Sequence, residues 1–459
     1  MRAVAGLGRR APVAALTAAG GLLPIVAIAA TRGVPARLVT GVAVLVVIAA
    51  FHRALLSWRS LLTMLVLLIL FVPIKRYTLP FQVSGNFKLE PYRAFVSVVV
   101  LAWVLSLLAD PRVRARASGL EWPFLLIATT TLGSVIVNFG SIQSLGVSTD
   151  VAKSLIFFAS FFLVFYFVVS TVRSHADIDR VVKLFVAGGA AVATAAIVES
   201  KTQYNVFDHL RAVFPFLQFN VLVDPNSDLN QFTRGGEDRV FASAQHPIAL
   251  SALLVMLLVV AIVYLILRPR QTSRWWPALL PMLVVIHFAL PHTLGVLKSS
   301  LFPSGGVSAL VTEQTAEAQS RRSSGRLADI SPTIQQVSQT DPLLGVGFGS
   351  RVVEGPLANA RILDDQWLDT VLETGFLGLF AWGWLLTRFL RRTFRAASEE
   401  TGERGWFLVA VAASITAFAV GMFLFDAFGF TQETIVFFLL LGLGSVALRL
   451  RGQATPAQS

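Results

Sequence analysis

Residues 152–171 read AKSLIFFASFFLVFYFVVST, and this stretch decides the fold class. Its only charged side chain is that of Lys153, in the second position. The hydrocarbon core of a bilayer is about 30 Å thick, and about 20 apolar residues in an α-helix cross it. The stretch is therefore predicted to be a transmembrane helix.

Similar apolar blocks recur along the chain, and the composition agrees with them. Hydrophobic residues make up 55% of the 459 residues and charged residues only 14%, whereas soluble domains carry about 25% charged residues. We expect an all-α polytopic membrane protein with about twelve transmembrane helices (10–12). The expected spans are 13–30, 37–51, 60–74, 94–108, 122–139, 152–171, 181–198, 248–267, 276–296, 365–387, 406–425 and 432–449.

Lysine and arginine in the short loops predict the orientation, because cytoplasmic loops carry an excess of both. With the N-terminus in the cytoplasm, alternate loops collect most of the arginines, and the short outer loops collect few. We therefore expect a multi-pass protein of the cytoplasmic (inner) membrane with both termini cytoplasmic. The basic N-terminal stretch is expected to lead into an uncleaved first span.

This orientation divides the chain into six regions. N-terminal transmembrane helices occupy 1–198, further transmembrane helices occupy 247–297, and C-terminal ones occupy 363–450. Two long extracytoplasmic loops, 199–246 and 298–362, separate them, and 451–459 form a cytoplasmic tail. The first loop is rich in aromatic and apolar residues, so we expect it to pack on the membrane surface.

Several functional classes are disfavoured by composition. The chain contains no cysteine, which excludes disulfides, cysteine zinc sites and thiol nucleophiles. Its six histidines lack metal-ligand spacing, so neither a metal nor another cofactor is expected. The net charge of +12 comes largely from the short loops, and no nucleic-acid-binding motif is present, so no nucleic-acid partner is expected.

Residues 363–378 read LDDQWLDTVLETGFLG and place four carboxylates at the outer end of an expected span. The helix dipole explains acidic residues in the first turn, such as Asp364 and Asp365. Asp365, Asp369 and Glu373 follow at i, i+4 and i+8, on one helix face, where like charges repel. Glu373 would lie roughly 13 Å along the helix. We predict that this face lines a polar cavity or meets arginines, with Trp367 at the membrane interface.

Arginines in the two outer loops are the candidate partners. Arg234 and Arg239 end the first loop, and Arg326 lies in the second. The planar guanidinium group suits phosphate and carboxylate oxygens. Together the arginines and carboxylates indicate an outward-facing site for a lipid-linked phosphate. The alternative is that these arginines are solvated loop charges.

Three segments, in order, resemble the O-antigen ligase and O-antigen polymerase superfamily. The segment RVFASAQHPIALSALL is similar to its Arg-x-x-Gly-x-Phe-x-x-Pro-x-x-Ala stretch. The segment SGRLADISPTIQQVSQTDPLLGVGFGS is similar to its Ser-Gly-Arg … His-Pro-Leu-x-Gly-x-Gly-x-Gly pattern. The segment DDQWLDTVLETGFLGLFAWGWLL is similar to its His-Asn-x-x-Leu-x-x-x-x-Glu-x-Gly-x-x-Gly helix. The resemblance covers roughly residues 234–390.

This resemblance implies a GT-C-like bacterial membrane glycosyltransferase of cell-surface polysaccharide biosynthesis. Such an enzyme transfers a glycan from a polyprenyl-pyrophosphate donor, with inversion, to a lipid or sugar hydroxyl on the outer face. The donor glycan, the acceptor and the bilayer are the implied partners, without a metal. By the resemblance, Arg239 and Arg326 would bind the pyrophosphate, with Arg234, Trp367, Asp369 and Glu373 in support.

The chain departs from the family pattern at two points. Asp364 stands at the family's histidine position and Asp365 at its asparagine position, so either is a substitute catalytic base or the function has changed. The expected Ser-Arg-Gly segment is absent. Ligase and polymerase remain equally open. The alternatives are a secondary transporter with Glu373 as a proton relay, and a catalytically silent scaffold of the cell envelope.

Overall fold

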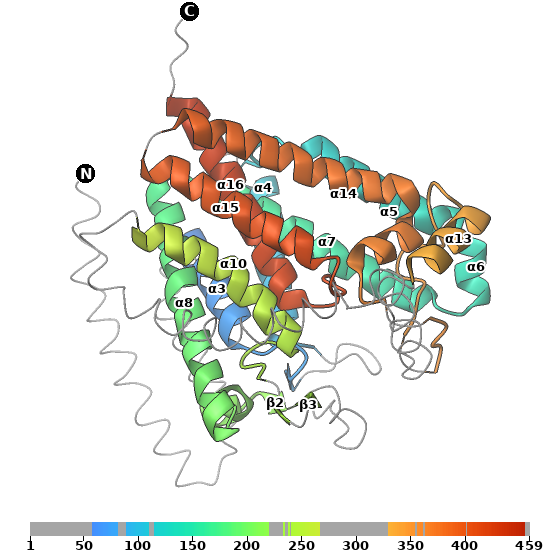
Figure 1. The fold of residues 1–459 in the computed structure, drawn as a ribbon, viewed down its shortest axis with the longest axis horizontal. Helices are drawn as coiled ribbons and strands as arrows, with labels where there is room; N and C mark the ends of the chain where they lie inside the picture. The colour runs from blue at the N-terminus through green and yellow to red at the C-terminus, as the bar shows by residue number, and fades with distance from the viewer. Residues whose placement is uncertain are drawn as a thin grey trace, which may run out of the picture.

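The computed structural model describes residues 57–80, 89–109, 114–219, 233–234, 237–238, 240–266, 329–353, 356–360, 363–400 and 402–454. Helices dominate this part of the chain (Figure 1). They are α3 (Trp58–Phe71), α4 (Pro91–Ala109), α5 (Glu121–Val137), α6 (Phe139–Ser144), α7 (Ser148–Thr171), α8 (His175–Thr202), the 3-10 helix η1 (Val206–Ala212), α10 (Pro247–Ile266), α13 (Ile330–Thr340), α14 (Gln366–Glu399), α15 (Glu403–Gly421) and α16 (Thr431–Ala454).

Four two-residue strands form two small antiparallel pairs. Strand β1 (Tyr77–Thr78) pairs with β2 (Gln218–Phe219), and β3 (Thr233–Arg234) pairs with β4 (Glu237–Asp238). The first pair ties the segment after α3 to the long segment after α8. The strands therefore join loops and form no layer of their own.

Seven helices in the described part are long and apolar enough to cross a membrane, namely α4, α7, α8, α10, α14, α15 and α16. The apolar helices α3 and α5 are shorter. These nine helices correspond, in order, to nine of the twelve expected spans, which confirms the polytopic helical class. The expected spans 13–30, 37–51 and 276–296 lie outside the described residues.

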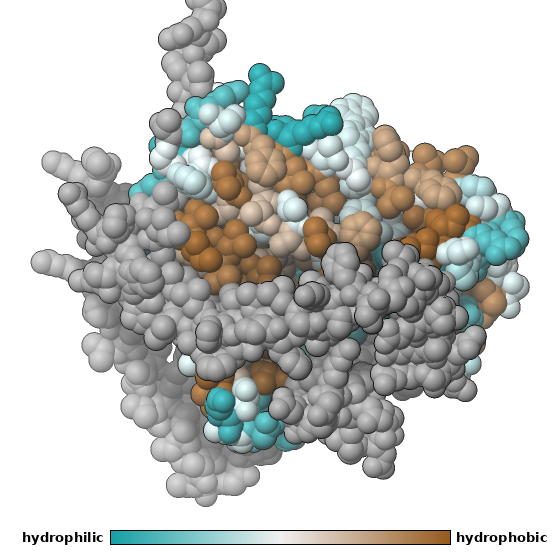
Figure 2. Space-filling view, viewed as in Figure 1, coloured by the Kyte–Doolittle hydropathy of each residue, from teal (hydrophilic) through white to brown (hydrophobic). Residues whose placement is uncertain are grey.

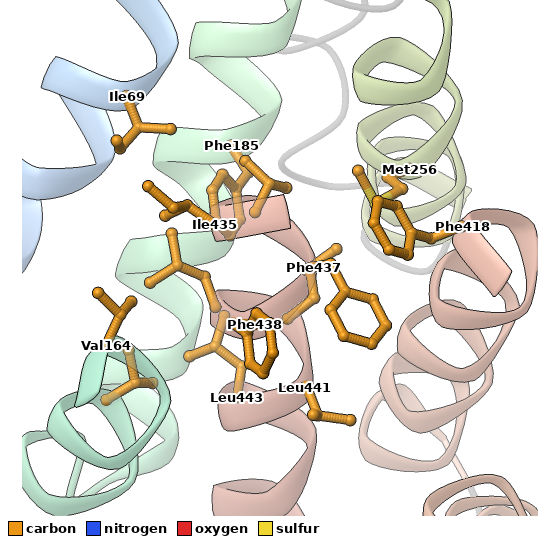
Figure 3. Packing of buried hydrophobic residues seen from close by; sticks show 14 of the residues in the cluster. Ile69, Val164, Phe185, Met256, Phe418, Ile435, Phe437, Phe438, Leu441 and Leu443 are labelled. Carbon is orange, nitrogen blue, oxygen red and sulfur yellow. The ribbon is translucent and has the colours of Figure 1, made fainter. Parts of the chain in front are cut away.

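Helix α16 forms the centre of the bundle and contacts α7, α10, α14 and α15. Apart from Ser445, its residues 435–448 are apolar or glycine on all sides, a pattern typical of a helix buried on every face. Phe437 and Phe438 are fully buried in the core shown in Figure 3. The Phe438 ring stacks on Phe161 of α7, with ring centroids 5.6 Å apart. Aromatic packing of this kind fixes the long helices against one another.

The outer surface of the bundle is also apolar. Large side chains such as Leu108, Ile156 and Ile136 are more than two-thirds exposed. Figure 2 shows hydrophobic residues covering much of the visible face of the described helices. Contiguous exposed apolar surface on long helices is what a bilayer accommodates and water does not. The fold therefore belongs in a lipid bilayer.

Two ends of the bundle differ in composition. At one end, which we call the basic end, Arg388 Nε donates to Gly119 O over 2.8 Å and Arg449 Nη1 to Val169 O over 2.8 Å. The opposite end, which we call the loop end, holds α13 together with residues 72–79, 138–147, 203–219, 240–246 and 422–430. The carboxylates at the start of α14 lie at the loop end.

Candidate functional site

Helix α14 is interrupted at Gly375, whose backbone has φ 68° and ψ −172°. Side chains with a Cβ strongly disfavour this conformation, and glycine tolerates it. A Cβ at Gly375 would also collide with the backbone of Leu343. Two helical segments therefore meet at a break beside Glu373, inside the span expected over 365–387, which is long and apolar enough to cross a membrane.

The glycine-rich loop of residues 341–350 fills this break. Val346 N donates to Leu372 O over 2.9 Å, and Phe376 N donates to Pro342 O over 2.9 Å. These bonds satisfy backbone groups that the interrupted helix leaves without helical partners. Gly345 has a positive φ of 71°, and a Cβ there would collide with Leu372 O. The glycines therefore allow the loop to approach the backbone of α14.

This loop brings an arginine to the acidic face of α14. Arg351 follows the loop directly and forms an ion pair with Asp369, and the two side chains are only 12% and 21% exposed. Gly349 N donates to Glu373 Oε1 over 3.1 Å. An arginine was expected on this face, but Arg351 itself was missed. Its position directly after GFGS was the signal in the sequence.

A third carboxylate joins the group from the segment between α15 and α16. Asp426 Oδ1 accepts a hydrogen bond from Gly429 N over 3.1 Å. Burial raises the pKa of Asp426 to about 6; the neighbouring Asp369 charge acts in the same direction, and Lys75 and Arg351 oppose it. We call Asp369, Glu373, Asp426 and Arg351 the carboxylate cluster. Asp426 was also missed from the sequence.

The raised pKa of Asp426 predicts a pH-dependent stability. The folded state favours the protonated form of Asp426. The contribution of this protonated carboxyl to the free energy of unfolding is therefore fully present below its unfolded pKa near 3.9, and it is lost as the pH rises through about 6. We expect the melting temperature of the purified protein to fall across this window by less in Asp426→Asn than in the wild type. Thermal unfolding in detergent at pH 4 to 7 measures the difference, and superimposable profiles would contradict the assignment.

The two predicted catalytic aspartates differ in environment. Asp365 is the N-cap of α14, and its Oδ1 accepts from Trp367 N over 2.9 Å and from Leu368 N over 3.1 Å. It is 7% exposed, whereas Asp364 is more exposed, in the intermediate range. Asp365 thus has a structural task, and Asp364 is the better placed of the two to meet a substrate.

Loss of this cap has a predictable cost. Asp365→Ala should lower the free energy of unfolding by about 1–2 kcal/mol, because two backbone N–H groups at the start of α14 lose their acceptor. Asp365→Asn keeps an acceptor oxygen and should remain close to the wild type. Thermal unfolding of the two variants side by side tests the assignment. Equal losses in both would indicate that the charge of Asp365 matters more than the cap.

The start of α14 is docked onto α15 and the segment after it. Gln366 N donates to Met422 O over 2.7 Å, and Gln366 Oε1 accepts from Phe428 N over 2.8 Å. Trp367 Nε1 donates to Ala419 O over 3.1 Å. Trp367 therefore binds α15 by its indole N–H, which fixes the helix that carries Asp369 and Glu373.

The end of the first long loop reaches the same region. Gln245 Nε2 donates to Gly429 O over 2.7 Å, next to the Gly429 amide that binds Asp426. Arg76 donates to the Ala244 carbonyl, pairs with Asp208 at 2.9 Å and lies over the Phe241 ring at 4.2 Å. Residues 241–246 are thus held against the segment between α15 and α16.

The structure places the other predicted site residues only in part. Arg239 and Arg326 lie outside the described residues. Arg234 lies in strand β3, and its side chain is outside the described part. Within the described ranges, no group of three or more histidine and acidic side chains is arranged to hold a metal ion.

Comparison with known proteins does not assign this chain to a family. No protein-family model matches the chain, and no curated protein matches it.

Proposed function

We propose that this protein is an inverting glycosyltransferase of the inner membrane, with a GT-C-like architecture of about twelve spans and both termini in the cytoplasm. It transfers a glycan from a polyprenyl-pyrophosphate donor to a lipid or sugar hydroxyl on the outer face, in bacterial cell-surface polysaccharide synthesis. Either ligation or polymerisation fits this chemistry. In this proposal the loop end faces outward and the basic end faces the cytoplasm.

The observation that supports the proposal is the meeting of the three motif segments at the loop end. The glycine-rich loop is hydrogen-bonded into the break of α14. The segment around Asp426 binds both the start of α14, through Gln366, and the end of the first long loop, through Gln245. Segments far apart in the chain thus converge around buried charges. A shared functional site requires such convergence, whereas unrelated loops would not produce it.

The chemistry assigns different tasks to the charged groups. The acceptor oxygen forms a bond to the anomeric carbon while the bond from that carbon to the pyrophosphate oxygen breaks. Asp364 takes the hydroxyl proton as general base. Arg239 and Arg326 stabilise the pyrophosphate leaving group. Arg351 stays paired with Asp369. Its positive charge reduces the repulsion between the carboxylates on α14 and an anionic donor.

In vitro glycan transfer tests this proposal. Purified protein is incubated with a polyprenyl-pyrophosphate-linked glycan and an acceptor, and release of polyprenyl pyrophosphate is measured. Asp364→Asn should lower turnover by about 10²–10⁴-fold without changing thermal stability. Arg326→Ala should lower turnover as well, and Asp365→Asn should retain most of it.

Two outcomes would count against the proposal. Full turnover in Asp364→Asn would show that Asp364 is not the catalytic base. If the wild type shows no transfer in vitro and does not complement ligase-deficient or polymerase-deficient strains, the proposed activity is wrong.

The break in α14 favours a second candidate, a secondary transporter, because interrupted helices with adjacent carboxylates form ion sites in such proteins. Glu373 lies two residues before the break at Gly375. Gly375 is the tenth of 34 residues in α14, which places the break about 15 Å along the helix axis, close to half the thickness of a bilayer core. Substrate uptake into proteoliposomes that Glu373→Gln abolishes would favour the transporter.

A further inference from the structure

A cavity of about 280 Å³ lies at the basic end, at the opposite end of the bundle from the carboxylate cluster. Residues of α8, α10, α15 and α16 and the end of α14 line it. The proposed transfer reaction at the loop end does not use it.

The lining changes from polar to apolar along the helices. On α8, His175 stands at the helix start and Val182 lies about 10 Å further in, at 1.5 Å per residue. On α15, Arg404 stands in the first turn and Ala410 lies about 9 Å further in. The cavity thus has a charged mouth at the helix ends and an apolar floor toward the interior of the bundle. An amphipathic molecule at a membrane surface has this same polarity.

The mouth carries charges of both signs. Its carboxylates are Asp179, Glu400 and Glu403. Asp179 pairs with Lys183 at 2.8 Å, and Glu400 pairs with Arg451 at 3.4 Å.

The mouth also holds N–H donors from an arginine and a histidine. Arg404 and His175 both line the cavity, and among the described residues neither forms an ion pair or hydrogen bond. Arginine and histidine side by side provide N–H donors for phosphate oxygens. The adjacent carboxylates disfavour a ligand with several negative charges and favour one that also carries an ammonium group.

We propose that this cavity binds one phospholipid with a zwitterionic phosphoethanolamine head group from the leaflet at the basic end. Arg404 and His175 bind the phosphate, and Glu400 and Glu403 face the ammonium group. One acyl chain begins on the apolar floor around Val182, whose surroundings exclude water. The cavity is at the small end of ligand sites, which fits a head group and the first part of one chain.

Native mass spectrometry of the purified full-length protein tests the site. The protein is titrated with phosphatidylethanolamine and, separately, with phosphatidylglycerol of identical acyl chains. We expect one phosphatidylethanolamine per chain, bound about tenfold more tightly than phosphatidylglycerol, since single exposed charge contacts contribute modestly. Combining Arg404→Ala with His175→Ala should weaken phosphatidylethanolamine binding by about tenfold.

A charge swap and a matched control make the test specific. Glu403→Gln should weaken phosphatidylethanolamine binding and strengthen phosphatidylglycerol binding, a selectivity change that a folding defect does not produce. Arg391→Ala removes an exposed arginine at the same end that does not line the cavity, and should change neither. Equal or preferred binding of phosphatidylglycerol by the wild type, or the same loss in Arg391→Ala as in the double variant, would overturn the proposal.

Discussion

Arg351→Ala is expected to lower the free energy of unfolding by about 3 kcal/mol, because it leaves the Asp369 carboxylate in a largely buried site without its cation. For a chain of this size, the loss corresponds to a melting temperature roughly 3 °C lower. Thermal unfolding of the wild type and the variant in detergent measures the loss.

A double-mutant cycle separates the pair from its neighbours. Asp369→Asn alone leaves Arg351 without its anion and should also be destabilised, whereas the double variant Arg351→Ala with Asp369→Asn should be more stable than the sum of the single losses predicts. Arg211→Ala, which removes an exposed arginine at the same end, is the control. Additive losses in the cycle would show that the ion pair does not couple the loop to α14.

Gly375→Ala is expected to have the second large effect, a loss of about 3 kcal/mol or more. The substitution adds a Cβ where φ is 68° and where the Leu343 backbone already occupies the space. The glycine-rich loop must then move away from α14, and it carries Arg351 with it. The proposed transfer activity should fall together with the melting temperature.

Gly383 supplies a matched control on the same helix. A Cβ at Gly383 meets nothing within 4 Å, and its backbone is helical. Gly383→Ala should therefore be neutral or stabilising by up to about 1 kcal/mol, because alanine has the higher helix propensity. If Gly375→Ala and Gly383→Ala behave alike, the break at Gly375 is not needed for stability.

Sequence reasoning placed some residues of the candidate site and missed others, for physical reasons. The spacing of Asp369 and Glu373 sufficed to predict a shared helix face, since 3.6 residues per turn is a local property. Their partner could not be found this way, because Arg351 reaches Asp369 only after the loop enters the break of α14. Asp426 lay at the edge of an expected span, and its place beside Asp369 depends on how α15 and α16 pack.

What the sequence determined by itself is the membrane class, the order of nine helices and the acidic face at the start of α14. Each follows from local composition: an apolar run of sufficient length must be helical in a bilayer, and a helix sorts its side chains by its own period. Only the tertiary structure decided that α14 breaks at Gly375 and that Arg351 faces Asp369. These depend on close contacts between segments far apart in the chain, and no local pattern encodes which backbone a loop will meet.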